Sequence, residues 1–215
     1  MPAIRPAREA LTGRFIRLEP FQPGHLPGLW TALGRPEVFA GGYGGGPAGL
    51  PADEAAFHDW ALDHFPHARG NTYVGVVRGG AHDGEVVGAS SLADFDEVKE
   101  HAHIGWTGWD PRVWATQVNP EAKLLMLGLA FDHGYGRVKL QADDRNTRSK
   151  AAIAKLGAVF EGVERRAVKR ADGSWRDTAI FSVLVDEWPV VKAGLEARLD
   201  QWGDRPVEFR DIGSL

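Results

Sequence analysis

The sequence predicts one α/β domain built around a mixed β-sheet, and three observations support this prediction. The chain has 215 residues, of which 43% are hydrophobic, enough to bury most of its apolar surface in one core. Several strand-like segments lie at hairpin spacing, which indicates antiparallel pairing. A strand, a long apolar helix and another strand then follow one another, which indicates a parallel crossover.

The N-terminal part is predicted to contain one strand, two helices and a glycine-rich loop. Residues 15–19 alternate apolar and polar side chains, as a short strand does. Residues 25–33 and 53–65 carry apolar side chains at helical spacing. The loop at residues 41–49 formally matches the glycine fingerprint of dinucleotide sites, but no strand precedes it. We therefore interpret it as a mobile connection between the two helices.

Three strand-like segments follow, at residues 72–78, 85–92 and 102–109. The period then changes, because residues 119–133 form the strongest helical pattern in the chain. Asn119 suits the N-cap of this helix, and the proline after it suits the first helical position. The many leucines of the helix predict that it is buried.

The C-terminal part is predicted to hold a strand, a helix, a hairpin and a surface helix. The expected elements are a strand at 138–141, a helix at 147–156, strands at 158–170 and 178–185, and a helix within 186–202. An Asp-Gly pair between the last two strands favours a hairpin turn there.

Composition excludes several classes of function. A formal net charge of -4 gives no reason to expect nucleic acid or an anionic membrane as a partner. The chain has no cysteine, which removes disulfides, thiolate nucleophiles and cysteine-type zinc sites and fits a reducing compartment. No segment resembles a signal peptide or reaches the roughly 20 apolar residues that span a bilayer. We therefore expect a cytoplasmic protein, and the histidine spacings give no reason to expect a metal site.

The segment from Trp109 to Pro120 is the best candidate for a phosphate-binding site. It leaves a strand and enters a helix, so unpaired backbone N–H groups and the positive end of the helix dipole meet there. Arg112 and Lys123 are near enough in sequence to add positive charge. The alternative is a helix N-terminus that binds nothing. The dense Arg and Lys run over residues 137–176 is likewise either a solvated face or a receiver of a phosphorylated ligand.

Several motifs together resemble one family. They are the strand at 102–109 with its Ile104-Gly105-Trp106, the loop and helix after it, and Asn146-x-x-Ser149 followed by Lys155-Leu156-Gly157. The chain resembles the GNAT superfamily of acyl-CoA-dependent N-acyltransferases, and most of all the branch that contains the ribosomal-protein N-terminal acetyltransferases. The resemblance runs from about residue 11 to about residue 188, and the segment 146–157 is its most specific part.

The resemblance implies how the whole chain is organised. Residues 1–188 would form one GNAT-like domain, with a mostly antiparallel sheet of about seven strands flanked by helices, and residues 189–215 a C-terminal helix and tail. Acetyl-CoA would be the acyl donor, without a metal. Relatives of this branch are often dimers, so a homodimer is one expected state.

The resemblance also implies roles in an acyl-CoA site. The strand at 104–107 would pair with the pantetheine amides, and the loop up to Asn119 would hold the pyrophosphate through main-chain N–H groups. Asn146 would contact the pantetheine arm, or act only as a helix cap. Ser149 would stabilise or protonate the leaving thiolate, or be an exposed helix serine. The expected cofactor-binding residues are Ile104, Gly105, Trp106, Thr107, Arg112, Ala115, Thr116, Gln117, Val118, Asn119, Lys123, Asn146 and Ser149.

Two places depart from the family pattern. The family loop usually carries glycines where Ala115 and Gln117 stand, and the larger glutamine is expected to fill part of the groove. His103 stands where many relatives have a glutamate. As a catalytic residue beside Ser149 it would take the proton of the amine near neutral pH, unless it is simply exposed.

The acceptor side of the site is predicted only from the resemblance. The glycine-rich loop would border the acceptor, so that Phe39, Tyr43 and Phe57 would line the acceptor site. Asp94 would attract a cationic amine.

The sequence therefore predicts an N-acyltransferase that moves an acetyl or other acyl group from acyl-CoA to a primary amine of a small molecule or a peptide. The amine would attack the thioester directly, with catalysis by positioning. An alternative, favoured by the altered loop, is a non-catalytic GNAT-like module that binds a CoA-type ligand or a protein partner. A third possibility keeps the enzyme but changes the donor to a larger or acidic acyl-CoA, which the Arg-rich segment favours.

Overall fold

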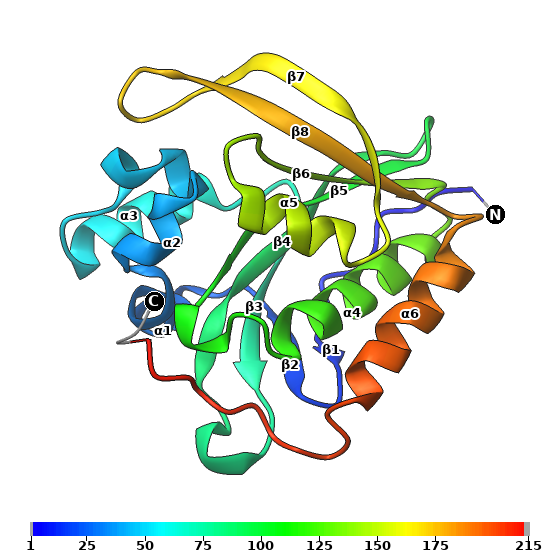
Figure 1. The fold of residues 1–215 in the computed structure, drawn as a ribbon, viewed down its shortest axis with the longest axis horizontal. Helices are drawn as coiled ribbons and strands as arrows, with labels where there is room; N and C mark the ends of the chain where they lie inside the picture. Colours follow the sequence, from blue (N-terminus) through cyan, green and yellow to red (C-terminus); the bar gives the residue numbers. More distant parts are fainter. Residues whose placement is uncertain (1, 213–215) are drawn as a thin grey trace.

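The computed structural model describes residues 2–212, which form one eight-stranded sheet flanked by helices (Figure 1). The sheet order is β1-β2-β3-β4-β5-β6-β8-β7, and within the described residues only β5 and β6 pair in parallel. The strands are β1 (Leu11–Thr12), β2 (Ile16–Pro20), β3 (Asn71–Val77), β4 (Val86–Asp96), β5 (His101–Trp109), β6 (Arg137–Asp143), β7 (Val159–Lys169) and β8 (Trp175–Leu184).

This architecture confirms the predicted α/β domain with a mixed, mostly antiparallel sheet. The strand that the sequence analysis missed is β1, which pairs Leu11 with Leu18 and Thr12 with Arg17. Two residues are too few to show the alternation that marks a strand.

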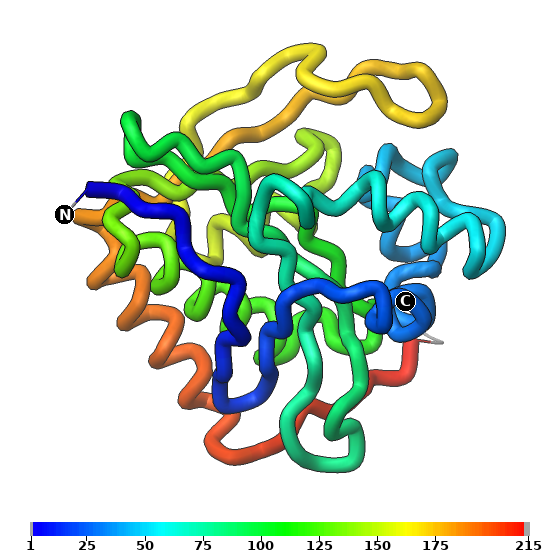
Figure 2. Tube along the Cα trace, turned by 180° about the vertical axis from the view of Figure 1, so that it is seen from behind, coloured from blue at the N-terminus to red at the C-terminus, as the bar shows by residue number. Residues whose placement is uncertain are grey.

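Helices cover both faces of the sheet (Figures 1 and 2). The helices are α1 (Leu26–Leu33), α2 (Pro36–Ala40), α3 (Glu54–His64), α4 (Val118–Asp132), α5 (Thr147–Ala154) and α6 (Trp188–Asp200). Along β3, Tyr73 and Val77 belong to the core that contains residues of α4, α5 and α6. Val74 and Val76 belong to a second core with residues of α1, α2 and α3. This alternation explains why every residue of β3 is buried.

Helix α4 starts one residue earlier than predicted, and its cap is different. The N-cap is Gln117, whose side chain makes no capping hydrogen bond. The expectation that Asn119 caps the helix is therefore wrong. Asn119 lies inside the first turn, where its Oδ1 accepts a hydrogen bond of 3.0 Å from the Trp109 indole N–H.

Glu121 connects α4 to the N-terminal strands. Its carboxylate accepts hydrogen bonds from the backbone N–H groups of Arg14, Phe15 and Ile16, at 2.7 to 2.8 Å. A Cβ atom at Gly13 would meet the carboxyl carbon at 2.4 Å, so the turn before β2 needs glycine to admit this side chain. Burial raises the pKa of Glu121, and the backbone hydrogen bonds oppose that rise.

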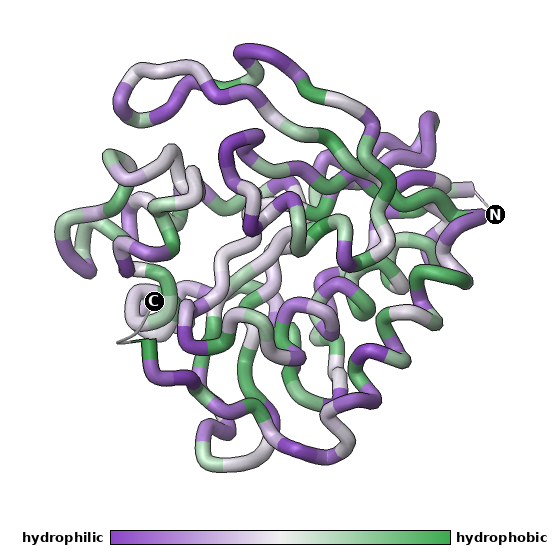
Figure 3. The backbone as a smooth tube through the Cα atoms, viewed as in Figure 1, coloured by the Kyte–Doolittle hydropathy of each residue, from purple (hydrophilic) through white to green (hydrophobic). Residues whose placement is uncertain are grey.

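Helix α6 and the tail after it belong to the main core. Val191, Leu195 and Leu199 of α6 and Val207 of the tail are buried together with α4 and the sheet. The helix was expected at the surface, and its other side chains are largely exposed. The tail runs from α6 to the neighbourhood of α1 (Figure 1), and the tip of the β7–β8 hairpin is hydrophilic (Figure 3). Among residues 2–212, no helix has the length and apolarity that a membrane span requires.

Candidate active site

A cavity of about 730 Å³ lies where β5 and β6 separate. Its walls come from β5, β6, α5, the loop before α4, the glycine-rich loop and the β7–β8 hairpin. The two parallel strands pair only from His101–Arg137 to Ile104–Leu140, although β5 continues to Trp109. The cavity therefore occupies the gap left by the diverging strands.

The free edge of β5 offers backbone groups to this cavity. Residues from Ile104 to Trp109 line it, and beyond Ile104 none pairs with β6. A bulge deforms the strand here, because Trp106 has a φ of 51° and the register with β4 shifts between Ser91 and Ala89. Unpaired backbone N–H and C=O groups require partners. An extended ligand with amide groups would supply them.

In the loop before α4, a position where the family usually has glycine adopts the left-handed backbone conformation that glycine favours. Ala115 has a φ of 58°, in the left-handed region. Thr116 braces the loop by donating to the Val113 carbonyl at 2.6 Å. Both Ala115 and Thr116 line the cavity.

Gln117 does not narrow the groove, so that expectation is wrong. Its side chain is buried and its Nε2 donates to the Arg205 carbonyl of the tail at 3.2 Å. Gln117 and Val118 are absent from the cavity wall. Gln117 and Arg205 are 88 positions apart in the sequence, so a local sequence pattern cannot reveal their contact.

Arg112 also lies outside the cavity wall. Its guanidinium makes a two-pronged ion pair with the fully buried Asp110, with Nη2 2.7 Å from Oδ2. On another side it lies 4.4 Å from the centre of the Phe209 ring. The charge of Arg112 is thus paired with Asp110, away from the cavity, and a role of Arg112 in phosphate binding stays an untested prediction.

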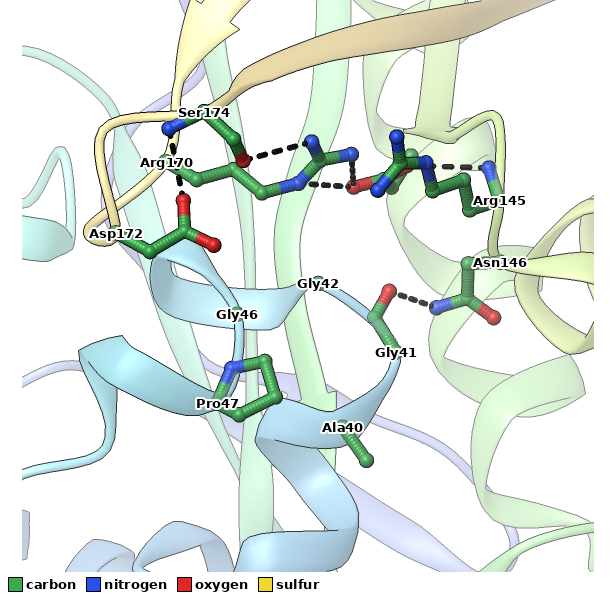
Figure 4. Close-up of a pocket in the computed structure, with 11 residues that line it drawn as sticks. Ala40, Gly41, Gly42, Gly46, Pro47, Arg145, Asn146, Arg170, Asp172 and Ser174 are labelled. Atoms are coloured by element: carbon green, nitrogen blue, oxygen red, sulfur yellow. Dashed lines mark hydrogen bonds and ion pairs between the residues drawn. The ribbon is translucent and has the colours of Figure 1, made fainter.

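Asn146 and Ser149 both line the cavity, at the start of α5. Asn146 caps the helix, because its Oδ1 accepts from the Ser149 backbone N–H at 2.9 Å. Its Nδ2 donates to the Gly41 carbonyl at 2.6 Å, an interaction that Figure 4 shows. The side chain thus joins α5 to the glycine-rich loop. A contact with pantetheine and a thiolate role for Ser149 stay predictions.

His103 is buried and faces the cavity, so it is not the exposed strand residue that was the alternative. Its Nδ1 lies 2.9 Å from Oδ2 of Asp94, while its Nε2 is buried and has no hydrogen-bond partner within residues 2–212. When Asp94 accepts the Nδ1 proton, Nε2 carries the free lone pair.

The ionisation of this pair favours a neutral imidazole. Burial lowers the pKa of His103, and the hydrogen bond to Asp94 opposes that effect without overcoming it. The same hydrogen bond lowers the pKa of Asp94. His103 can therefore accept a proton at neutral pH. Asp94 does not itself line the cavity, so it lies behind the imidazole rather than at an acceptor amine.

Of the three aromatic residues expected at the acceptor side, only Tyr43 lines the cavity. Phe39 and Phe57 are fully buried in the second core, and both pack against Trp60. Their helical periodicity is that of core residues, which explains the error.

His64, which the sequence analysis did not select, joins Tyr43 on the cavity wall. The two rings lie 5.2 Å apart, and neither the Tyr43 hydroxyl nor His64 Nε2 has a partner among the described residues. Burial lowers the pKa of His64 to about 4 and raises that of Tyr43.

The described cavity wall is strongly positive despite the negative net charge of the chain. Its cationic residues are Lys123, Arg148, Lys155, Lys169, Arg176 and Arg198, against the single carboxylate of Asp143. That carboxylate is itself paired with Arg170 at 2.6 Å, next to the small pocket of Figure 4. The Arg148 guanidinium lies 3.3 Å from the centre of the Trp114 ring. Such a wall attracts an anionic ligand.

Lys123 occupies an unexpected place on this wall. It is 4% exposed, and its Nζ donates to the hydroxyls of Ser90 and Thr107, at 2.9 Å each. The phosphate role was expected from its closeness in sequence to the loop. Helical geometry turns it instead toward β4 and β5.

Residues 2–212 contain no group of three or more His, Cys, Asp or Glu side chains that could hold a metal ion. The described cavity wall therefore combines the unpaired edge of β5, the neutral imidazole of His103 and several cationic side chains.

Comparison with known proteins agrees with this geometry. A family model described as the acetyltransferase (GNAT) domain matches residues 16–159. The chain is similar to a GCN5-related N-acetyltransferase from Brucella melitensis, with 28% identity and a TM-score of 0.82 over 92% of this chain and 88% of that one. It is similar to a T. thermophilus protein assigned as an acetyltransferase, with 34% identity and a TM-score of 0.78 over 91% of this chain and 100% of that one.

RimJ from Mycobacterium smegmatis, solved with a CoA disulfide, shares the fold at 18% identity and a TM-score of 0.65, over 85% of this chain and 88% of that one. No curated protein matches the chain. Because the family model covers most of the chain, including β5, β6 and the helix between them, the chain belongs to the GNAT acetyltransferase family.

Proposed function

We propose that the protein transfers an acyl group from an acyl-CoA to a primary amine by direct attack. The observation that carries this proposal is the meeting of two features in one cavity. The unpaired edge of β5 lines the gap between β5 and β6, and so does His103, whose Nε2 has no partner among the described residues. The first suits an extended pantetheine arm, and the second suits an amine that must lose a proton.

The residues present fit an acyl-CoA, the donor of this family. The β5 edge does not pair with β6 beyond Ile104, which leaves room for the pantetheine amides to pair with its backbone. Asn119 and Pro120, at the start of α4, line the cavity, so the positive end of the helix dipole lies where the pyrophosphate would bind. Arg148 and Arg198 add positive charge to the cavity wall.

The chemical step needs a base, a polarised carbonyl and a stabilised leaving group. His103 Nε2 takes the proton of the amine as its nitrogen attacks the thioester carbonyl carbon. A backbone N–H of the bulged part of β5 polarises that carbonyl. As the new C–N bond forms and the C–S bond breaks, the Ser149 hydroxyl donates to the departing sulfur. Asp94 holds the imidazole in the tautomer that keeps Nε2 free, which makes it a positioning residue.

The proposed acceptor is a primary amine on a small molecule or a peptide. Tyr43 and His64 flank the place it would take, and neither is charged at neutral pH. The positive wall favours an acceptor that arrives uncharged at the attacking nitrogen or carries negative charge elsewhere.

The alternative, a non-catalytic GNAT-like module, has less support than the enzyme. It was favoured because Gln117 was expected to narrow the groove, and the side chain of Gln117 lies against the tail instead. No other feature of the described residues favours it over the enzyme.

Turnover with a panel of amines and acetyl-CoA, followed by release of free thiol, tests the proposal. His103→Gln should lower kcat by about a hundredfold or more, since that is the typical contribution of a positioned base. His133→Gln is the matched control, because His133 lies at the end of α4 and bonds the Leu129 carbonyl at 2.8 Å. Failure of every amine to react, or an unchanged kcat in His103→Gln, would overturn the proposal.

A further inference from the structure

Lys123 is a buried amine whose hydrogen-bonding capacity is not used up. Its Nζ donates to Ser90 Oγ and Thr107 Oγ1, and these hydroxyls lie 2.7 Å from each other. An ammonium group has three N–H donors, so one remains after these two bonds. Lys123 lines the cavity, and no acceptor among the described residues takes this third donor.

The charge of Lys123 also lacks a partner. No carboxylate within residues 2–212 forms an ion pair with it, and burial lowers its pKa to about 7 with no opposing charge. Burying an unpaired charge is costly, and an apolar side chain would fill the same space without that cost. The fold alone therefore gives no reason for a lysine at this position.

Two observations place Lys123 near the reacting end of the cavity rather than the phosphate end. Thr107 lies in the bulged part of β5, directly after Trp106. The charge of Lys123 is also close enough to contribute to the lowered pKa of His103, the proposed base. In the binding mode proposed above, the part of an acyl-CoA that reaches this end is the acyl chain.

The other charged groups near Lys123 do not neutralise it. Lys139 acts on His103 in the same direction as Lys123, and Asp94 is bonded to the far side of the imidazole. Glu121, two residues earlier on α4, is bonded to the backbone before and within β2. Arg198 of α6 adds positive charge to the same cavity.

We propose that Lys123, Ser90 and Thr107 form a subsite for a carboxylate at the end of the acyl chain, so that the preferred donor is the CoA thioester of a short dicarboxylic acid. This inference rests on the proposed function and specifies its donor. An acetyl methyl group would leave an amine and two hydroxyls facing an apolar group. A terminal carboxylate would accept the third N–H and supply the missing negative charge.

Calorimetric titration of matched donors tests the subsite. Succinyl-CoA is compared with butyryl-CoA, malonyl-CoA with propionyl-CoA, and coenzyme A is the reference without an acyl chain. In the unmodified protein, at least one acid should bind about tenfold or more tightly than its uncharged match, the gain expected of a charge-assisted hydrogen bond. Binding of that acid at about pH 8 should also take up close to one proton, since pairing restores the charge of Lys123.

Lys123→Met supplies the decisive variant, because it keeps the length of the side chain and removes only the amine. The mutual hydrogen bond of Ser90 and Thr107 remains, so the variant should fold. The preference for the acid and the proton uptake should both disappear. Lys192→Met, an exposed position on α6, removes the same charge outside the cavity and should retain both.

Three results would overturn the subsite. They are equal affinity for acid and match in the unmodified protein, an acid preference that survives in Lys123→Met, and a covalent acyl adduct on Lys123 in place of reversible binding. The fate of the proposed function is separate. If coenzyme A binds but the acidic acyl-CoA donors bind no more tightly than their uncharged matches, only the subsite is overturned. If no CoA species binds, both the subsite and the proposed function are overturned.

Discussion

Helix α4 buries two charged side chains, Glu121 and Lys123, that lie two residues apart and point in different directions. Glu121 faces the turn before β2 and accepts three backbone N–H bonds, which nearly exhausts its capacity. Lys123 faces the cavity, bonds two hydroxyls and has no counter-ion among the described residues. Both are less than 5% exposed.

The difference shows how a structural buried charge can be told from a functional one. A charge whose partners all belong to the fold is explained by the fold. A charge that keeps a free donor toward a cavity is explained by something that enters the cavity. Glu121 therefore positions β2, and Lys123 serves the ligand.

The largest effect is expected from removing Glu121. Glu121→Leu leaves the N–H groups of Arg14, Phe15 and Ile16 without their acceptor and should lower the free energy of unfolding by roughly 3 to 5 kcal/mol. Urea denaturation measures this. Glu196→Leu, at an exposed position of α6, should change stability by less than about 0.5 kcal/mol. A loss of stability no greater than that of the control would contradict the structural role of Glu121.

The next effect concerns the stability of Lys123→Met as a function of pH. Burial lowers the pKa of Lys123 in the folded state to about 7 from the ordinary 10.5. The unfolded chain then binds more protons than the folded one between these values, so the wild type gains stability as the pH rises through this range. The variant lacks this gain.

The stability advantage of Lys123→Met over the wild type should therefore shrink by roughly 3 kcal/mol between about pH 6.5 and about pH 9.5. Thermal or urea unfolding of both proteins at each pH measures the difference, in which the other titrating groups cancel. A difference that does not depend on pH would show that the amine is not desolvated.

The smallest effect is expected for Asp94, the residue proposed to position the His103 imidazole, and it concerns the reaction rate. Asp94 opposes the lowering of the His103 pKa, so Asp94→Asn should lower that pKa further and move the acid limb of the pH–rate profile to lower pH. The rate should fall by about tenfold, because the imidazole becomes a weaker base and loses its fixed tautomer. Asp96→Asn is the control, since Asp96 pairs with Lys99 at 3.0 Å. An acid limb that moves to higher pH would contradict the arrangement.

Much of the fold could be predicted because its signals are local. The apolar run of α4, the Asp-Gly turn between β7 and β8 and the alternation in β2 each lie within a short stretch. The free edge of β5 came from the family resemblance, whereas the cap at Asn146 was the alternative to the role that the resemblance implied. What local patterns could not show is which face of α4 each residue takes. The residue types Asn119 and Pro120 predicted the cap at Asn119, and the structure places Asn119 against Trp109.

The site was predicted less completely, for the same physical reason. Arg112 was chosen for its charge, but Asp110 two residues earlier neutralises it, a pairing that the sequence could have suggested. Arg176 was included only within the basic run 137–176, and Arg198 was not chosen because α6 approaches the cavity only in the folded chain. Phe39 and Phe57 were chosen as aromatic residues near the glycine-rich loop, yet they form the core that supports it.

Calorimetric titration of acetyl-CoA and coenzyme A into the unmodified protein is the most direct test of whether the cavity binds an acyl-CoA. We expect a heat of binding that saturates at about one ligand per chain and weakens with added salt, because the cationic cavity wall would contact the phosphates. Absence of a heat signal for both ligands at low salt, from folded protein, would contradict it.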